Sequence, residues 1–271
     1  MSRRVRLDAE LVRRNLARSR EHASTLIADG AVLVAGRTAS KPATQVGTDQ
    51  PIVVREGDDP GWASRGAHKL LGALEVFEPL GLRVEGRTCL DAGASTGGFT
   101  DVLLRRGASR VHAVDVGYGQ LVWTLRTDER VVVHDRTNVR SLTRESLADV
   151  PDLVVSDLSF ISLTVVMPAL TSVCRSEGDI VLMIKPQFEV GREHLGKKGV
   201  VRDPRQHERS VLAVCASASA HGWGTRELAA SPLPGPAGNV EYFCWLRTDA
   251  PPVDPARAAE VVAAGPAGGA A

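Results

Sequence analysis

CLDAGASTGGFT, at residues 89–100, combines the end of an apolar strand, an acid, a glycine-rich turn and the start of a helix. Glycine has no Cβ, so such a turn lets a ligand lie directly against the backbone. In open α/β sheets this turn stands at the carboxyl end of the first strand, where ligands bind. A turn that only connects strand and helix is the alternative. The candidate cofactor-binding residues of the stretch are Asp91, Gly93, Ala94, Ser95, Thr96, Gly97, Gly98 and Phe99.

A second acid, Asp115, ends the next apolar run, about 20 residues further on, as a nucleotide fingerprint requires. A carboxylate at that position can accept both hydroxyls of a ribose. The turn departs from G-x-G-x-x-G and is not followed by a P-loop lysine, which favours an adenosine cofactor without a pyrophosphate. We therefore expect S-adenosylmethionine, with Asn138 and Asp157 completing the candidate cofactor-binding residues.

Length and composition set only broad limits. A chain of 271 residues forms one large domain, or one large and one small domain. The net charge of +1 says nothing about a nucleic-acid partner. The four cysteines lack C-x-x-C spacing, so we expect buried, reduced thiols in a cytoplasmic protein and no metal site. No apolar run approaches the roughly 20 residues that span a bilayer.

Residues 5–60 are expected to form a small α+β unit. Asp8 and Ser19 can cap two short helices, and short strands are expected at 32–34 and 52–54. Residues 1–41 hold nine Lys and Arg against four Asp and Glu, and guanidinium groups match phosphate geometry. The alternative is an ordinary solvated basic surface. The candidate RNA-binding residues here are Arg3, Arg4, Arg6, Arg14, Arg18 and Arg20.

Two pieces of this region resemble the S4 RNA-binding domain in their order. Arg18-Ser19-Arg20 opens the second helix, and GAVLVAG follows at residues 30–36. The resemblance implies that the N-terminal unit binds RNA.

The rest of the chain alternates strands and helices, which predicts a mostly parallel, doubly wound sheet. A helix is expected from Ser64 to about Phe77. Further helices are expected at 98–106, 119–126, 143–148, 162–176 and 204–221. Strands are expected at 111–115, 131–134, 153–157, 180–184 and 240–246, with one more at 224–230. The Ala, Gly and Pro-rich residues 248–271 are expected to be a disordered tail.

Three strands carry a charged residue at an end. Asp157 and Lys185 each follow a strand, so both should lie on the same edge as the glycine turn. Glu241, which begins the strand at 240–246, reaches that edge only if its strand runs antiparallel to the others. Ordinary helix or turn caps are the alternative for each.

With Lys69, this set resembles the K-D-K-E tetrad of FtsJ-type ribose 2′-O-methyltransferases. The residues after Asp157 do not form the D/N-P-P-Y that holds an exocyclic amine, and no Pro-Cys pair supports a covalent thiol route. The resemblance implies that Lys185 is the base or orienting group, held by Asp157 and Glu241. Lys69 would fix the hydroxyl or the neighbouring phosphate.

Residues 3–247 as a whole resemble the TlyA family of rRNA (cytidine-2′-O)-methyltransferases. The motifs that carry the resemblance lie at 64–70, 91–100, 185–189 and 238–242. It implies a Rossmann-like class I methyltransferase domain at 65–247, joined by a linker at 61–64 to an S4-like domain at 1–60. It also implies 16S or 23S rRNA of the 30S or 50S subunit as substrate, and sensitivity to capreomycin and viomycin. The Arg3-Arg4 arm favours action on both subunits.

Three further cations are candidate RNA contacts: Arg65, and Lys197 and Lys198 in the basic loop at 191–199. A solvated loop without a partner is the alternative for the lysines. Two other functions remain open, a membrane-damaging haemolysin and a non-catalytic RNA-binding scaffold. The haemolysin would need a spanning or strongly amphipathic helix, and we find neither. We expect no membrane and no DNA partner.

Overall fold

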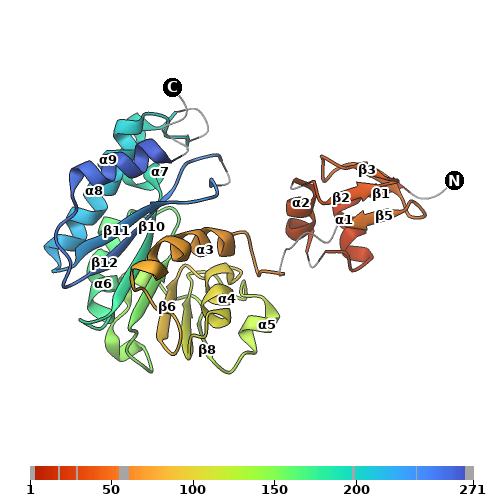
Figure 1. Cartoon of the computed structure of the whole chain (residues 1–271). Coiled ribbons are helices and arrows are strands. Elements are labelled where there is room, and N and C mark those ends of the chain that lie inside the picture. Colours follow the sequence, from red (N-terminus) through yellow and green to blue (C-terminus); the bar gives the residue numbers. More distant parts are fainter. Residues whose placement is uncertain are drawn as a thin grey trace. The chain divides into compact units, whose positions relative to one another are not determined.

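A computed structural model of the chain describes residues 4–17, 19–28, 30–54, 61–196, 199–235 and 237–265. The chain divides into two compact units, Met1–Gly61 and Trp62–Ala271 (Figure 1). Each unit has its own apolar core and is described by itself. In the part of the chain that the structure describes, no helix is long and apolar enough to cross a membrane.

The first unit packs two short helices on two small sheets. Its elements are β1(Arg4–Arg6), α1(Leu7–Arg13), α2(Arg20–Ala28), β2(Val32–Val34), β3(Arg37–Thr38), β4(Gln45–Gly47) and β5(Ile52–Val54). β1 pairs with β4, and β2 lies between β3 and β5. The Ser19 hydroxyl accepts from His22 N at 3.1 Å, which confirms the expected cap. Asp8 is not the N-cap residue, because it lies buried within α1, but its carboxylate accepts from the first-turn amide Ala9 N at 2.8 Å as well as from Arg6 and Arg20.

The second unit is built on a seven-stranded sheet of order β11-β12-β10-β9-β6-β7-β8. β12 runs antiparallel to both of its neighbours, and the remaining pairs are parallel, which confirms the expected doubly wound architecture. The strands are β6(Thr88–Ala92), β7(Arg110–Val114), β8(Val131–His134), β9(Leu153–Ser156), β10(Asp179–Ile184), β11(Gly224–Ala230) and β12(Tyr242–Arg247).

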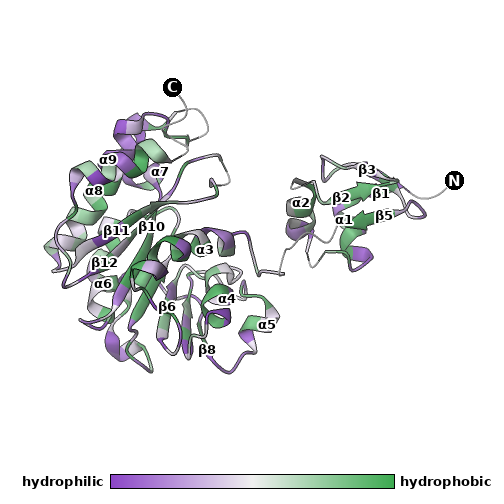
Figure 2. Ribbon diagram, viewed as in Figure 1, coloured by the Kyte–Doolittle hydropathy of each residue, from purple (hydrophilic) through white to green (hydrophobic). Residues whose placement is uncertain are grey.

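Helices cover both faces of this sheet because alternate strand residues point to opposite sides. Ile180, Leu182 and Ile184 share one core with α6(Leu163–Val173), α8(Pro204–Ala220) and α9(Pro255–Ala264). Val181 and Met183 share the other with α3(Gly66–Phe77) and α4(Gly98–Arg105). Figure 2 shows the central strands as hydrophobic, as expected of strands buried on both faces.

Two expected helices are largely absent. Residues 119–126 form a helix only at α5(Trp123–Arg126), because the Asp115 carboxylate binds Gly117 N at 2.7 Å and Gly119 has φ +65°, which hold the segment before α5 in turns. Residues 143–148 form a single 3-10 turn, η3(Arg144–Ser146). The remaining short elements are η1(Glu78–Leu80), η2(Val139–Ser141), α7(Pro186–Glu189) and η4(Arg192–His194).

The expected disorder of residues 248–271 is wrong for most of that stretch. Asp254 accepts from Ala256 N at 2.9 Å and caps α9, which begins at Pro255. Ala258, Val261 and Val262 are buried in the core shared with α6 and α8. Alanine has the highest helix propensity and packs closely, so an Ala-rich segment can be a docked helix. Residues 266–271 lie outside the described residues.

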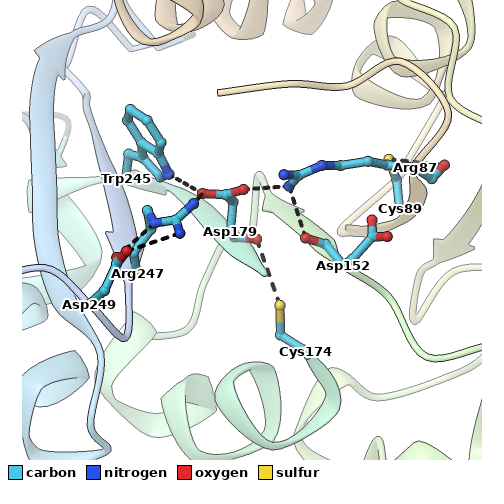
Figure 3. Close-up of polar contacts among 8 residues, drawn as sticks. All are labelled: Arg87, Cys89, Asp152, Cys174, Asp179, Trp245, Arg247 and Asp249. Carbon is cyan, nitrogen blue, oxygen red and sulfur yellow. Dashed lines mark hydrogen bonds and ion pairs between the residues drawn. The ribbon is translucent and has the colours of Figure 1, made fainter. Parts of the chain in front are cut away.

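The amino edge of the sheet is held by one buried acid, Asp179, at the start of β10 (Figure 3). Its Oδ1 accepts from Trp245 Nε1 at 2.7 Å and from the Arg247 guanidinium at 3.2 Å. Its Oδ2 accepts from the Arg87 guanidinium, which also donates to the Asp152 carbonyl at 3.0 Å. Asp179 therefore ties β10, β12 and the segment before β6 together.

Candidate active site

The glycine turn after β6 is shaped by a close approach between two backbones. Gly93 has φ +94°, and a Cβ there would stand 2.7 Å from the Asp157 carbonyl oxygen. Gly97 has φ +103°, and a Cβ there would stand 2.4 Å from Leu125 Cδ1. Both positions combine a left-handed conformation with too little space for a side chain, so they require glycine. The result is a bare backbone turn at the carboxyl edge of the sheet.

Asp91, at the end of β6, is a buried acid whose partners are incomplete. Its Oδ2 accepts from Thr100 Oγ1 at 2.7 Å. Its Oδ1 is buried and, within the described ranges, has no hydrogen-bond partner. Burial, despite the bond from Thr100, raises the pKa of Asp91 to about 7. A cationic ligand group beside this oxygen would supply the missing partner and favour the ionised acid.

Asp115 lies across the same turn, one residue beyond β7. Its Oδ2 accepts from Ser95 N at 2.9 Å, and its Oδ1 accepts from Gly117 N at 2.7 Å. Each carboxylate oxygen can accept two hydrogen bonds, so both keep room for a hydroxyl donor. Asn138 is exposed and caps η2 through a bond from Arg140 N at 3.0 Å. The neighbouring Thr137 N donates to the Asp115 carbonyl at 2.9 Å, which brings Asn138 close to Asp115.

From Trp62 on, the segment expected as a linker at 61–64 belongs to the second unit and packs against α4. The Arg105 guanidinium lies 4.2 Å from the centroid of the Trp62 ring, and Ala63 N donates to the Asp101 carboxylate at 2.8 Å. Both partners belong to α4. A Cβ on Gly98 would stand 2.2 Å from Ser64 Oγ, so this segment packs on the start of α4, directly behind the glycine turn.

Lys185 and Asp157 form an ion pair where β10 and β9 end. Lys185 Nζ lies 2.6 Å from Asp157 Oδ1 and donates to Ser159 Oγ at 2.8 Å. Lys185 is only 8% exposed, so its ammonium depends on these partners in place of water. Ser159 is exposed, which leaves the pair open to solvent on one side.

Lys69 and Glu241 form a second, more deeply buried ion pair. Lys69 Nζ lies 2.5 Å from Glu241 Oε2, and the two residues are 8% and 1% exposed. The position of Lys69 differs from expectation. By helix spacing, Lys69 shares a side with Arg65, away from the apolar residues of α3, yet Lys69 is buried and Arg65 is exposed. A single helix pattern cannot anticipate a partner 172 residues further along the chain.

Both pairs lie at the same edge and on the same face of the sheet. Ile184 pairs with Tyr242, so the next step of the antiparallel ladder brings Lys185 opposite Glu241. Lys185 has extended backbone angles, and residue alternation directs its side chain to the face covered by α3. On the same face, a Cβ on Gly66 at the start of α3 would stand 3.8 Å from Asp157 Oδ2. The antiparallel β12 thus brings Glu241 to the edge that bears Asp157 and Lys185.

The sequence did not single out Phe160, although its neighbour Ser159 binds Lys185, one of the candidate catalytic residues. It is 91% exposed and has φ +63°, a left-handed conformation that is unusual for a phenylalanine. Its ring centroid lies 5.2 Å from that of Phe188, which follows Lys185 by three residues. An exposed aromatic ring next to a buried lysine is typical of a surface that stacks on a base. The only signal in the sequence was its position three residues after Asp157.

The candidate RNA-binding arginines of the first unit differ in how far their guanidinium groups are exposed or bound within the fold. Arg6 and Arg20 share the Asp8 carboxylate and remain largely exposed, and Arg4 is exposed on β1. Arg14 binds Glu10 and the carbonyls of Gln50 and Thr48, which spends most of its donors within the fold. Arg14 is therefore placed as a structural residue. The remaining candidates lie outside the described residues: Arg3, Arg18, Lys197 and Lys198.

Comparisons with known proteins agree with both units. The model of the FtsJ-like methyltransferase family matches residues 62–248, and that of the S4 domain matches residues 5–52. The chain is 58% identical to the 16S/23S rRNA (cytidine-2′-O)-methyltransferase TlyA of Mycobacterium tuberculosis, over 92% of this chain and 91% of that protein. It is 36% identical to the 23S rRNA (cytidine-2′-O)-methyltransferase TlyA of Campylobacter jejuni, over 68% and 70%.

A solved structure covers nearly the whole chain. It is that of a protein named as a hemolysin from Streptococcus thermophilus, with a TM-score of 0.76 and 38% identity, over 97% of this chain and 96% of that one. The two family models and the extent of these matches show that the chain belongs to the TlyA family of FtsJ-like methyltransferases, with an S4 domain preceding the methyltransferase domain.

Proposed function

We propose that this enzyme transfers a methyl group from S-adenosylmethionine to the 2′-hydroxyl of a cytidine in rRNA. The observation that carries the proposal is the pair of lysine–carboxylate contacts at the carboxyl edge of the sheet, beside the glycine turn. The names of the relatives, which specify rRNA cytidine 2′-O-methylation, support the substrate. The enzyme would act on ribosomal subunits in the cytoplasm.

The glycine turn and its acids fit the proposed cofactor. The Oδ1 of Asp91, which has no partner among the described residues, would accept from its α-ammonium group, and the Asp115 carboxylate would accept from its ribose hydroxyls. The bare backbone at Gly93 and Gly97 would lie against it, and Asn138 is close enough to Asp115 to contribute. When bound, S-adenosylmethionine supplies a methyl group on a sulfonium, which is already a good electrophile.

The chain's own task is then to position the nucleophile. A ribose 2′-hydroxyl is a weak nucleophile, so its oxygen must be oriented and its proton removed as the O–C bond forms, while the methyl–sulfur bond breaks and S-adenosylhomocysteine would leave. Lys185 would hold that oxygen, and Lys185 with Asp157 would receive the proton. Lys69, fixed by Glu241, would bind the hydroxyl or the adjacent phosphate. Phe160, which is exposed close to the Lys185–Asp157 pair, would stack on a base of the RNA.

RNA recognition would be shared between the two units. The exposed guanidinium groups of Arg4, Arg6 and Arg20 suit phosphates of structured RNA, as does Arg65 beside the active site. We include Arg3, Arg18, Lys197 and Lys198 in this surface on the basis of the sequence alone. Action on both subunits is the finer proposal, favoured by the Arg3-Arg4 arm and by the name of the M. tuberculosis relative.

The test is to incubate the enzyme with purified unmethylated 30S or 50S subunits and tritiated S-adenosylmethionine, and to map the blocked ribose by reverse transcription. We expect label in both rRNAs, each at one cytidine. Label in only one subunit would refute action on both. Absence of label from both subunits would refute the proposed substrate. The same methylation would make the ribosome sensitive to capreomycin and viomycin, so cells that lack the enzyme should tolerate higher doses of both drugs.

A further inference from the structure

Two polar residues near the candidate catalytic residues, half-buried Glu189 and buried Asn239, have no part in the proposed chemistry. Glu189 lies in the motif at 185–189 and Asn239 in the motif at 238–242. Glu189 directly precedes residues 190–200, the segment that leaves the sheet after Lys185 and α7, and Asn239 binds the end of that segment. Lys197 and Lys198 within it lie outside the described residues. We refer to this segment as the 190–200 loop.

Glu189 holds the beginning of the loop on α6. One carboxylate oxygen accepts from Ser162 Oγ at 2.6 Å and the other from Leu163 N at 2.8 Å. Leu163 N is a first-turn amide of α6 and would otherwise have no intrahelical partner. Burial raises the pKa of Glu189, so the ionised carboxylate at this position costs free energy of desolvation, which its hydrogen bonds partly offset. The end of α7 is thereby fixed to the start of α6.

Asn239 holds the other end of the loop on the segment that leads into β12. Its Oδ1 accepts from Val201 N at 2.9 Å, and its Nδ2 donates to the Gly199 carbonyl at 3.0 Å. The side chain is buried, so both its donor and its acceptor are committed to this short stretch. Glu241 follows two residues after Asn239, so the loop ends beside the second ion pair.

A second contact holds the same residue, Val201, through its carbonyl group. His207 Nε2 lies 3.0 Å from the Val201 carbonyl oxygen, and Tyr242 Oη lies 3.2 Å from His207 Nδ1. A carbonyl can only accept, so Nε2 carries the proton and Nδ1 accepts from the tyrosine hydroxyl. Both side chains are buried. Val201 is therefore held through its N–H by Asn239 and through its carbonyl by His207.

We propose that Glu189 and Asn239 are positioning residues that fix the 190–200 loop along the catalytic edge, where it contacts the backbone of the substrate RNA. The loop begins after α7, which directly follows Lys185, and ends at Asn239, two residues before Glu241, so its anchors hold it along the edge that bears both ion pairs. Arg192 is exposed on the described part of the loop, and its guanidinium group suits a phosphate. A free loop would lose conformational entropy when RNA binds, and anchoring it beforehand removes much of that cost. This inference rests on the proposed function.

The experiment compares Glu189→Ala and Asn239→Ala with the wild type in the full-length enzyme. Affinity for S-adenosylmethionine is measured by calorimetry, and KM and kcat are measured with the subunit that the wild type methylates. We expect KM for the subunit to rise roughly tenfold, the effect of about 1.4 kcal/mol, with affinity for the cofactor unchanged. Glu189→Gln, which keeps an oxygen to accept from Leu163 N, should recover most of the loss.

The matched control is Asp254→Ala, which removes the N-cap hydrogen bond of α9, in which Ala256 N donates to Asp254 Oδ1 at 2.9 Å. It should lower the melting temperature without changing KM for the subunit. Tyr242→Phe serves as a milder variant if an alanine variant does not fold, because it removes only the hydroxyl that orients His207, and it should raise KM by a smaller factor.

Wild-type KM and kcat in the folded anchor variants would overturn the inference, as would an equal rise in KM for the Asp254 control. A loss of cofactor affinity in parallel with RNA affinity would also overturn it. Failure of the proposed function is a different result, because the wild-type enzyme itself would then transfer no methyl group to either subunit.

Discussion

The two edges of the seven-stranded sheet both hold buried charges, but they satisfy them differently. At the amino edge, both oxygens of Asp179 are bound by Trp245, Arg247 and Arg87 (Figure 3). At the carboxyl edge, Asp91 has one oxygen without a partner in the described part of the chain, and the Lys185–Asp157 pair lies beside exposed Ser159 and Phe160.

The difference separates structural charges from functional ones. A buried acid whose partners all come from the chain contributes to the fold, and adding a ligand would gain it nothing. A buried acid with an open hydrogen-bonding position, next to a turn without side chains, is arranged for a ligand. Substitutions at the amino edge should therefore affect stability, and substitutions at the carboxyl edge should affect binding or catalysis.

The largest expected effect on stability is at the amino edge. Asp179→Ala leaves two guanidinium groups and an indole N–H without their acceptor, which should cost about 3–5 kcal/mol of unfolding free energy. Urea unfolding measures this loss. The kcat of the folded fraction should stay near that of the wild type. A selective loss of kcat with normal stability would break the contrast between the edges.

Asp115→Ala should have the opposite signature. Hydrogen bonds to a charged group contribute about 1.5–3 kcal/mol, so cofactor affinity should fall by roughly 10- to 100-fold. Calorimetry with S-adenosylmethionine measures the change, with Asp128→Ala, which removes a contact to Arg130, as a control. Unaltered affinity in the Asp115 variant would remove this acid from the cofactor site.

Phe160→Ala should weaken RNA binding alone. Stacking of one base on an aromatic ring contributes about 1–3 kcal/mol, so KM for the methylated subunit should rise while cofactor affinity and stability stay constant. Val165→Ala, at another exposed apolar residue, is the matched control and should have no effect. Equal KM values for the two variants would argue against a base at Phe160.

The smallest expected effect is a pH dependence. Burial raises the pKa of Asp91 to about 7, so the acid is increasingly protonated as the pH falls below that value. The cofactor's ammonium group requires the ionised form, so binding must release the proton, and affinity should fall by roughly fivefold between pH 7 and pH 6. Asp91→Asn should bind more weakly and with a flat profile. A steep profile retained by that variant would assign the titration to another group.

Short motifs predicted the residues of the carboxyl edge well, because its glycine turn and its strand ends are each formed by neighbours in the sequence. The acid and glycines of 91–98 and the charged ends at Asp157 and Lys185 could be placed by strand polarity alone. The burial of Lys69 could not be predicted, because its partner Glu241 is supplied by a distant antiparallel strand.

The amino edge gave no comparable signal. Asp179 precedes an apolar strand as many turn residues do, and only tertiary packing gives it three donors from β12 and the segment before β6. The helix α9 was misjudged for a related reason, because Ala-rich composition is shared by tails and by small, closely packed helices. Arg14 was counted with the candidate RNA-binding arginines because charge alone cannot reveal that Glu10 and two backbone carbonyls bind it.

The most direct test of the functional edge is Lys185→Ala, assayed in parallel for S-adenosylmethionine affinity and for methyl transfer to ribosomal subunits. Loss of a positioned proton-transfer group typically costs about 10²–10⁴-fold in rate. The account predicts cofactor affinity within about twofold of the wild type, since a factor of two is only ~0.4 kcal/mol, together with a loss of transfer of that size. Transfer at the wild-type rate in the folded variant would contradict it.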